Sequence, residues 1–370
     1  MIVTLTPNPS VDRTIAFDLI RRGEVQRATS SRVDPGCKGI NVSRALQANR
    51  TPTLAVLPAG GPEGHLLTEL LRSADVPFQT VEIAGAARMN VAAVEPDGTT
   101  TKLNEPGPQM SAAEVSALFD AAITAADGAD WLVACGSLPP GVPDSFYAEL
   151  VLRCAAADLK VAIDTSGSPF PLAAVAHPQL IKPNHEELAE LVGRPLPRFG
   201  DVVDAARRLV ADGVETVVVS LGADGALGVD ASGLVWAGAT VDDPLSTVGA
   251  GDCLLAGFLH ARVRGGDLEA AVREGVRWGA AAVRLPGSQV PAPADIAAVE
   301  VTSTNSPSST ASSPDAPHER TRRVSHHQRA GHPRPAWRRP PRGDPRARRA
   351  PGRIRSVHRP GRFPGRRPRP

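Results

Sequence analysis

The chain has 370 residues with 41 basic and 39 acidic side chains, yet the last 70 residues hold 18 of the former and 3 of the latter. Residues 1–300 are therefore acidic overall, and they are long enough for one large domain with a full core. Four scattered cysteines and the lack of any run near 20 apolar residues argue against a disulfide framework, a zinc site and a membrane span.

Short β-branched runs alternate with helical stretches rich in Ala and Leu. The predicted strands are Ile2–Thr6, Thr53–Leu57, Trp131–Ala134, Lys160–Asp164, Leu180–Lys182 and Thr216–Ser220. The predicted helices are Ile40–Ala48, Gly64–Ser73, Ala112–Ala126, Asp144–Ala156, His185–Leu191, Asp201–Asp212, Gly251–Arg264 and Leu268–Leu285. This alternation predicts an α/β fold with a mainly parallel sheet covered on both faces, whose ligands lie beyond the carboxyl ends of the strands.

Other stretches interrupt this alternation. The additional strand-like runs are Arg13–Phe17, Arg88–Val94 and Thr99–Leu103. The tripeptide Pro96-Asp97-Gly98 predicts a hairpin turn between the last two. We expect residues from about 12–35 and 88–105 to form a small β-sheet lid, with an ordinary edge hairpin as the alternative.

The segment from Ser246 to Asp252 reads Ser-Thr-Val-Gly-Ala-Gly-Asp and leads into an apolar helical run. Glycines let a ligand approach the backbone, and the first N–H groups of a helix attract phosphates. Asp252 stands where it could take a proton from a hydroxyl that attacks a phosphoryl group. The segment predicts a small-molecule kinase, and a helix start that happens to carry Gly and Asp is the alternative.

A second glycine cluster, from Pro35 to Val42, also runs into a helix. Gly and Lys before a helix suit an anion or a sugar hydroxyl. The cluster is not a Walker P-loop, because Lys38 is followed by Gly39 instead of Ser or Thr.

Seven segments carry a family resemblance through their order along the chain. They are Thr4–Asp12, Gly36–Val42, Arg88–Val91, Gly136–Gly141, Lys182–Glu187, Ser220–Gly225 and Ser246–Asp252. With them, residues 1 to about 295 resemble the ribokinase-like (phosphofructokinase B type) sugar kinases. Within that family the chain looks most like the phosphosugar branch, and Gly23–Arg27 and Lys38–Ser43 lean toward the 1-phosphofructokinases.

The resemblance implies a three-layer α/β sandwich with a mainly parallel central sheet and a small β-sheet lid. It implies an ATP- and Mg²⁺-dependent kinase that converts fructose 1-phosphate to fructose 1,6-bisphosphate. Tagatose 6-phosphate and fructose 6-phosphate are the alternative substrates. The family also implies a homodimer made through the lid. The first residues lack the pattern of a signal peptide, so we expect a cytoplasmic enzyme.

The resemblance assigns roles to matching residues. The catalytic base would be Asp252, with the amides of Gly249, Ala250 and Gly251 around the phosphoryl group. The expected sugar-phosphate ligands are Asp12, Lys38, Gly39, Asn41, Arg88 and Ser137. The expected nucleotide contacts are Lys182, Asn184, Ser220, Gly222 and Gly225, and Glu187 would hold Mg²⁺ through water. Structural roles stay open as alternatives: a turn for Asp12, a solvated Arg88, a helix start for Asn184 and Glu187, and a strand-to-turn connection for Ser220, Gly222 and Gly225.

Cys37 stands where the family usually has Gly. If that position takes a positive φ, a Cβ there costs about 1 kcal/mol or more. We therefore expect a working enzyme whose turnover or substrate affinity would rise on Cys37→Gly.

The tail, residues 301–370, is rich in Ser, Pro and then Arg. It cannot bury enough apolar surface to offset the entropy of ordering, so we expect disorder. Dense Arg could bind nucleic acid, which would fit a sugar-phosphate-binding regulator with weak catalysis. We favour the plainer interpretation, an appendage that does not bind nucleic acid.

Overall fold

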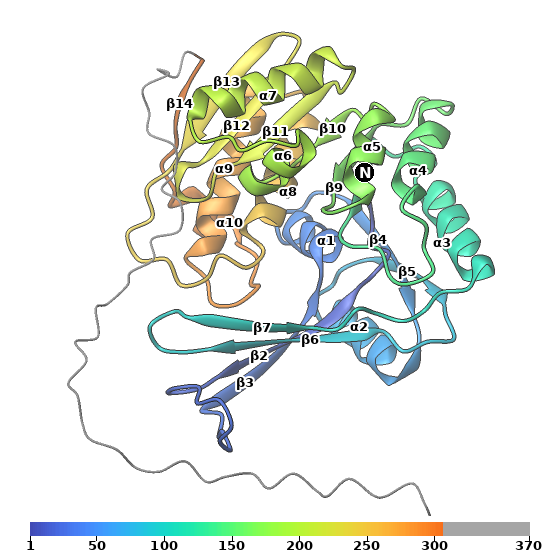
Figure 1. The fold of residues 1–370 in the computed structure, drawn as a ribbon, viewed down its shortest axis with the longest axis vertical. Helices are drawn as coiled ribbons and strands as arrows, with labels where there is room; N and C mark the ends of the chain where they lie inside the picture. Colours follow the sequence, from blue (N-terminus) through green and yellow to red (C-terminus); the bar gives the residue numbers. More distant parts are fainter. Residues whose placement is uncertain (306–370) are drawn as a thin grey trace, which may run out of the picture. The chain divides into compact units, whose positions relative to one another are not determined.

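The structure is a computed structural model that describes residues 1–305. Within them one sheet has the strand order β14-β13-β12-β11-β10-β9-β8-β1-β4-β5 (Figure 1). Its strands are β1 (Ile2–Leu5), β4 (Thr53–Ala59), β5 (Phe78–Glu82), β8 (Trp131–Cys135), β9 (Val161–Asp164), β10 (Leu180–Ile181), β11 (Thr216–Ser220), β12 (Ala226–Asp230), β13 (Gly233–Gly238) and β14 (Thr302–Thr304). The pairs from β5 to β11 are parallel, and those from β11 to β14 are antiparallel.

Helices cover both faces of this sheet. They are α1 (Lys38–Ala48), α2 (Gly61–Ser73), α3 (Ala112–Ala125), α4 (Phe146–Ala155), α5 (Pro169–Val175), α6 (His185–Leu191), α7 (Phe199–Ala211), α8 (Ala250–Arg262), α9 (Leu268–Val283) and α10 (Pro293–Ala297). One apolar core includes buried residues of α3, α4 and α7, and another includes buried residues of α1, α8 and α9.

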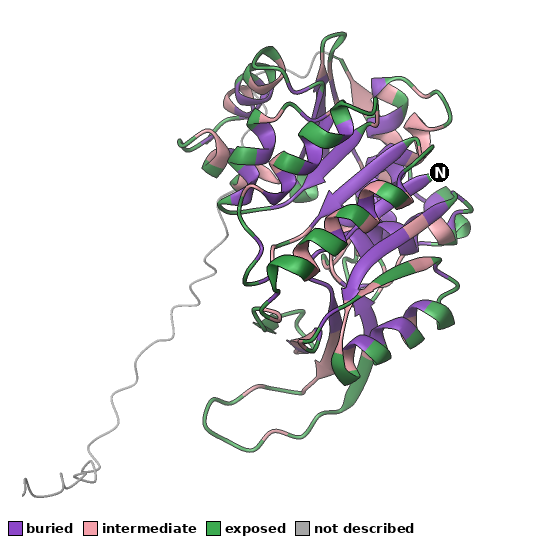
Figure 2. Cartoon of the chain, turned by 90° about the vertical axis from the view of Figure 1, so that its right-hand side faces the viewer, coloured by how far each residue is buried: buried purple, intermediate pink, exposed green. Residues whose placement is uncertain are grey.

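The sheet lies between these two cores because successive side chains of a strand point to opposite faces. In β8, Leu132 and Ala134 belong to the first core, whereas Trp131, Val133 and Cys135 belong to the second. All five are buried, which explains why the strand reads as one apolar run. Figure 2 shows such strands buried beneath helices that expose their outer sides.

A separate small sheet has the strand order β3-β2-β6-β7. Its strands are β2 (Ser10–Ala16), β3 (Ser30–Gly36), β6 (Arg88–Val94) and β7 (Thr100–Asn104). The β6–β7 hairpin turns at Gly98, which has a φ of +86°, and the N–H of Glu95 donates to the carbonyl of Thr99. Strand β3 ends at Gly36, directly before α1, and β2 pairs with β3 on one side and with β6 on the other, so the small sheet is joined to the glycine cluster that begins α1 (Figure 1).

The predicted α/β class with a mainly parallel sheet and a small additional sheet is confirmed. Each predicted strand and helix of the main layers lies where the sequence placed it, within a few residues. The sequence pattern did not predict the edge strands β5 and β14, the neighbouring strands β12 and β13, strand β3 of the small sheet described above, or the short helices α5 and α10. Strands β3, β5 and β13 are only partly buried, Gly228 interrupts β12, and β14, α5 and α10 have seven residues or fewer, so none shows the apolar pattern that marks the others.

Strand β14 pairs with β13 through Thr302–Thr304. The ordered fold therefore extends past the boundary drawn at residue 300, because these residues complete a sheet edge. The remaining tail and its proposed disorder lie outside the described residues. Within residues 1–305, no helix combines the length and apolarity that crossing a bilayer requires.

Candidate active site

Helix α8 begins at a glycine-dependent turn. Gly249 takes a φ of +80°, a left-handed conformation that L side chains rarely adopt, and no side chain caps the helix. Ala250 and Gly251 in its first turn line a cavity of about 1300 Å³. The first N–H groups of a helix have no helical carbonyl to bind, so this turn offers donors to an anion in the cavity.

Asp252 is buried in the same turn. Its Oδ2 accepts a hydrogen bond from Asn41 Nδ2 at 2.8 Å. Burial raises the pKa of Asp252 to about 6, helped by the charge of Asp164 and opposed by Lys38, Asn41 and Lys182. A carboxylate with a pKa near neutrality is suited to taking a proton in general base catalysis.

Two lysines meet at a second buried carboxylate, Asp164, at the end of β9. Lys38 Nζ lies 2.6 Å from Asp164 Oδ1, and Lys182 Nζ lies 3.1 Å from Oδ2. Lys38 Nζ is also 3.4 Å from Glu187 Oε1. Burial would raise the pKa of Asp164, but Lys182 and Lys38 outweigh it and hold that pKa below its usual value. Asp164 therefore stays ionised and holds the lysines, whereas Asp252 is the carboxylate able to accept a proton. We call Lys38, Asp164, Lys182, Glu187 and Asp252 the transfer centre.

Asp164 was not predicted as a site residue. A signal was available, since an acidic residue ends the apolar strand Val161–Asp164. The carboxyl ends of parallel strands are where ligands lie in such sheets. The pairing with Lys38 and Lys182 required the fold, because those residues are far apart in sequence.

The large cavity collects most of the predicted nucleotide residues. Asn184, Ser220, Gly222 and Gly225 line it together with Ala250 and Gly251. The rest of the wall is largely apolar, and it includes Ala239, Val241, Pro244, Leu254, Val276, Ala280 and Val283. An apolar wall that ends at a helix start suits a flat base with attached phosphates.

Lys182 does not line the cavity but reaches its end, because a Cβ on Gly251 would lie 3.6 Å from Lys182 Nζ. Gly225 is needed for close packing, since a Cβ there would collide with the carbonyl of Ala237. Lys182 therefore lies beside the first turn of α8, and its contact with a nucleotide at that turn stays a prediction.

Asn184 and Glu187 form a capping box at the start of α6. Asn184 Oδ1 accepts from the Glu187 N–H at 2.7 Å, and Glu187 Oε2 accepts from the Asn184 N–H at 2.9 Å. Asn184 and Glu187 therefore have the structural role of a helix start, which was the alternative to nucleotide and Mg²⁺ binding. The second carboxylate oxygen of Glu187, Oε1, faces Lys38. Among residues 1–305, no group of three or more His, Cys, Asp or Glu could hold a metal ion. Glu187 fits Mg²⁺ only where water and phosphate oxygens complete the shell, as Mg²⁺ prefers.

Arg88, on strand β6, binds the ends of neighbouring segments. Its Nη1 donates to the carbonyl of Glu105 at 2.9 Å, and its Nη2 donates to the carbonyl of Asn8 at 3.0 Å. Ser137 Oγ lies 3.5 Å from Arg88 Nη2 and accepts from Asn8 Nδ2 at 3.2 Å. The structure thus brings together Arg88 and Ser137, two of the six residues predicted to bind the sugar phosphate.

Asp12 lies on the neighbouring strand β2. Its Oδ1 accepts from Ser10 Oγ at 2.5 Å and from Asn90 Nδ2 at 3.2 Å. Burial raises the pKa of Asp12 although both donors lower it. Gly36 is required here, because a Cβ would collide with the Asp12 carboxyl group.

Several buried polar atoms near Asp12 and Arg88 have no hydrogen-bond partner: Asn8 Oδ1, Asn90 Oδ1 and Arg88 Nε. Unpaired buried polar atoms are costly and rare in folded proteins. Hydroxyls and a phosphate of a sugar could supply these partners. We call Asn8, Asp12, Cys37, Arg88 and Asn90 the sugar side.

Cys37 is strained. Its φ of 85° and ψ of 155° lie in a region occupied almost only by glycine. The sequence predicts a cost at Cys37 if this position takes a positive φ, and the structure shows that it does. The thiol donates to the carbonyl of Asn8 at 3.1 Å and accepts from Arg88 Nη2 at 3.2 Å. Burial raises the pKa of Cys37, so the side chain stays a neutral thiol.

Three residues predicted in the sugar pocket make other contacts. Lys38 pairs with acids of the transfer centre, and Asn41 bonds to Asp252. Gly39 packs against the end of β1, where a Cβ would collide with Thr6 Oγ1. Their contacts with sugar stay predictions.

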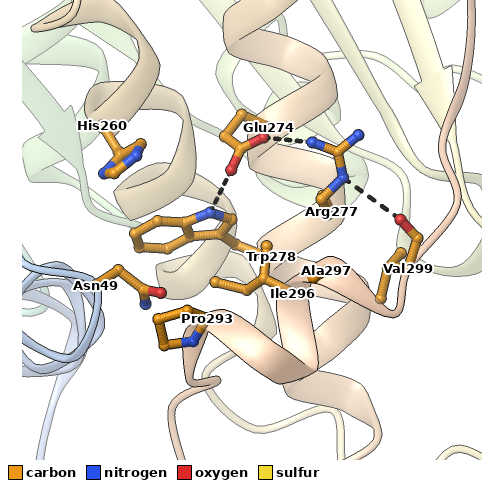
Figure 3. A pocket seen from close by; sticks show the side chains of 9 residues that line it. All are labelled: Asn49, His260, Glu274, Arg277, Trp278, Pro293, Ile296, Ala297 and Val299. Atoms are coloured by element: carbon orange, nitrogen blue, oxygen red, sulfur yellow. Dashed lines mark hydrogen bonds and ion pairs between the residues drawn. The ribbon is translucent and has the colours of Figure 1, made fainter.

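A second cavity of about 360 Å³ lies among α8, α9 and α10, and none of the predicted site residues lines it (Figure 3). Asn49 and His260 bond to residues outside its wall, and the polar groups of α9 pair with one another. Glu274 accepts from Trp278 Nε1 at 2.8 Å and from Arg277 Nη1 at 2.6 Å. We assign it no role.

The sequence pattern of the pfkB family carbohydrate kinases matches residues 5–295. The chain belongs to this family. This pfkB kinase is 35% identical over 306 residues to a 1-phosphofructokinase of Rhodobacter capsulatus, which covers 82% of this chain and 96% of the relative. Other relatives are named ATP-dependent 6-phosphofructokinase isozyme 2. The expectation of an ATP-dependent phosphosugar kinase is confirmed at the level of the family.

Solved structures agree. Phosphofructokinase-2 of Escherichia coli in complex with substrates and products superposes with a TM-score of 0.76 at 33% identity, covering 80% of this chain and 97% of that one. Ribokinase of Arabidopsis thaliana, complexed with ribose and ATP, has a TM-score of 0.64 at 20% identity over 80% and 97% of the two chains. The second comparison shows the shared ribokinase-like fold alone.

Proposed function

We propose that this pfkB kinase transfers the terminal phosphoryl group of ATP to the free primary hydroxyl of fructose 1-phosphate, giving fructose 1,6-bisphosphate. The kinase domain is residues 1–305. The observation that carries the proposal is the buried Asp252 carboxylate, whose pKa is raised to about 6. It lies in the first turn of α8 beside Ala250 and Gly251, which line the large cavity.

Asp252 takes the hydroxyl proton as the sugar oxygen attacks the γ-phosphorus. The bond between that phosphorus and the bridging oxygen breaks, and ADP leaves. Charge on the phosphoryl oxygens is stabilised by the amides from Gly249 to Gly251 and by the ammonium groups of Lys38 and Lys182. Fixed donors of this kind are effective because they need no reorganisation during the reaction.

The donor set at Glu187 supports Mg²⁺ held through water. When bound, the ion would neutralise charge on the triphosphate. Asn184 orients Glu187 through the capping box, and Ser220, Gly222 and Gly225 contact the nucleotide.

On the sugar side, Asp12 accepts hydrogen bonds from sugar hydroxyls. Arg88 and Ser137 hold the phosphate that the substrate already carries, since a guanidinium group suits a phosphate dianion. The unpartnered atoms of Asn8 and Asn90 support this placement.

Fructose 6-phosphate is the second candidate substrate, because 6-phosphofructokinases stand among the relatives. A panel of fructose 1-phosphate, fructose 6-phosphate and tagatose 6-phosphate, with ADP measured directly, separates the three. We expect the highest kcat/KM for fructose 1-phosphate, and a preference for either 6-phosphate would contradict the proposal. Asp252→Asn serves as the control for contaminating kinases.

A homodimer through the small sheet is part of the proposal. Every residue of its edge strand β7 is exposed, including Leu103, and an uncovered strand edge favours pairing. Sedimentation velocity of the protein and of Leu103→Lys tests it. We expect a dimer that weakens in the variant, whereas a monomer in both would refute it.

A further inference from the structure

Arg44 of helix α1 is buried where several segments meet. Its Nη1 lies 3.2 Å from the carbonyl of Pro35 and 3.0 Å from that of Ser288. The same nitrogen lies 3.0 Å from Asn41 Oδ1, and Nη2 lies 3.9 Å from Asp34 Oδ1. Burying a guanidinium group is costly unless it is paired, so these contacts explain how Arg44 is tolerated there.

The contact with Asn41 determines which end of its amide faces Asp252. A guanidinium group carries only donors, so it can bond the Asn41 oxygen and not the nitrogen. With Oδ1 held by Arg44, Nδ2 is directed at the Asp252 carboxylate, 2.8 Å away. The reversed amide would set two oxygens against each other at Asp252 and a donor against Arg44.

The other contacts of Arg44 connect this amide to the small sheet. Asp34 and Pro35 belong to β3, and Asp34 lies opposite Asp12 in the β2–β3 register. Arg44 therefore joins the strand pair that carries Asp12 to the residue that bonds Asp252.

We propose that Arg44 is a positioning residue that orients the Asn41 amide toward the catalytic base. The proposal rests on the proposed function, in which Asp252 takes the proton. Arg44 itself touches no reacting atom.

A double-mutant cycle tests this. Arg44→Met and Asn41→Ala are made singly and together, and kcat is measured with saturating ATP and sugar phosphate. Charged hydrogen bonds predict a loss of about tenfold or more for Arg44→Met alone. In the Asn41→Ala background the same change should cost less than about twofold, because there is no amide left to orient.

A merely structural Arg44 would lower kcat by the same factor in both backgrounds, and that additive result overturns the proposal. So does an Arg44→Met variant with unchanged kcat. Arg208→Met is the matched control, since Arg208 is exposed on α7 and pairs with Asp212 at 3.8 Å. Its kcat should equal that of the wild type.

If Arg44→Met does not fold, Arg44→Lys takes its place in the double-mutant cycle. Its single ammonium group keeps the charge but cannot reproduce the planar fork, so the same non-additivity with Asn41→Ala is expected. Additive losses overturn the proposal here too. Failure of the proposed function is distinguishable, because it appears as a wild type without kinase activity on any of the three phosphosugars.

Discussion

The transfer centre and the sugar side differ in how their polar groups are satisfied. In the transfer centre, Lys38 and Lys182 share Asp164, whose Oδ2 has no hydrogen bond but is paired by charge with Lys182 at 3.1 Å, and Lys38 also meets Glu187. On the sugar side, buried atoms of Asn8 and Asn90 lack partners.

The difference indicates that the two regions are organised for different steps, one for phosphoryl transfer and the other for binding the sugar phosphate. Charges of the transfer centre hold one another in place, which suits groups that must be fixed before phosphoryl transfer. Groups of the sugar side are completed by hydroxyls and phosphate, which suits selection of a substrate, because an analogue that leaves them unpaired is penalised. Changes in the two regions should therefore alter different kinetic constants.

The largest effect should come from Asp252→Asn in the transfer centre. Losing the general base is expected to lower kcat by about 100- to 10,000-fold. The melting temperature should not fall, because burial already disfavours the charge that is removed. ADP release and thermal unfolding measure the two. Turnover within tenfold of wild type would refute the assigned role.

Asp164→Asn should chiefly affect stability. The change leaves the buried ammonium group of Lys182 and the partly exposed one of Lys38 short of a partner, and breaking a buried pair costs about 3–5 kcal/mol of unfolding free energy. Urea unfolding measures it. Asp212→Asn removes an exposed ion pair with Arg208 and should cost less than about 1 kcal/mol. Equal losses in the two variants would contradict the pairing described for the transfer centre.

On the sugar side, Arg88→Ala should raise the KM for the sugar phosphate by about 10- to 100-fold, the worth of a charged hydrogen bond. The KM for ATP should stay within about twofold. Steady-state kinetics with each substrate varied separates the two constants. Arg21→Ala, in an exposed loop of the small sheet, is the control. An equal rise in the KM for ATP would contradict the separate roles of the two regions.

The pH dependence of kcat sharpens the role of Asp252. The base must be ionised to accept a proton, and its pKa is raised to about 6. Turnover should therefore be constant above about pH 7 and fall about tenfold per pH unit below pH 6. Asn41 lowers that pKa, so Asn41→Ala should move the acid limb upward. Direct ADP measurement avoids coupling enzymes, and a flat profile to about pH 5 would disagree.

The smallest effect concerns Cys37. Cys37→Gly relieves the positive φ and should stabilise the fold by about 1 kcal/mol, after the entropy that glycine adds to the unfolded chain. Cys37→Ser and Cys37→Ala keep the Cβ and should not stabilise. Chemical unfolding compares them. Turnover or affinity for the sugar phosphate should rise only in the glycine variant, and a rise in all three would point to the thiol instead.

Sequence periodicity predicted the buried strands and long helices well, because a strand covered on both faces must be apolar along its length. Strands β12 and β13 were not predicted, because Gly228 interrupts the apolar run of β12 and β13 is only partly buried. The glycine turn at Gly249 was also readable, because so few residues can take its conformation.

The sequence by itself determined the kinase class, the α8 turn and the family motifs, because each depends on residues adjacent in the chain. Only the tertiary structure decided that Lys38 and Lys182 share Asp164 and that Arg44 holds Asn41 against Asp252. Lys38 and Asp164 are 126 positions apart, and Asn41 and Asp252 are 211 positions apart. Their partners are chosen by where parallel strands end and helices cross, which no local pattern encodes.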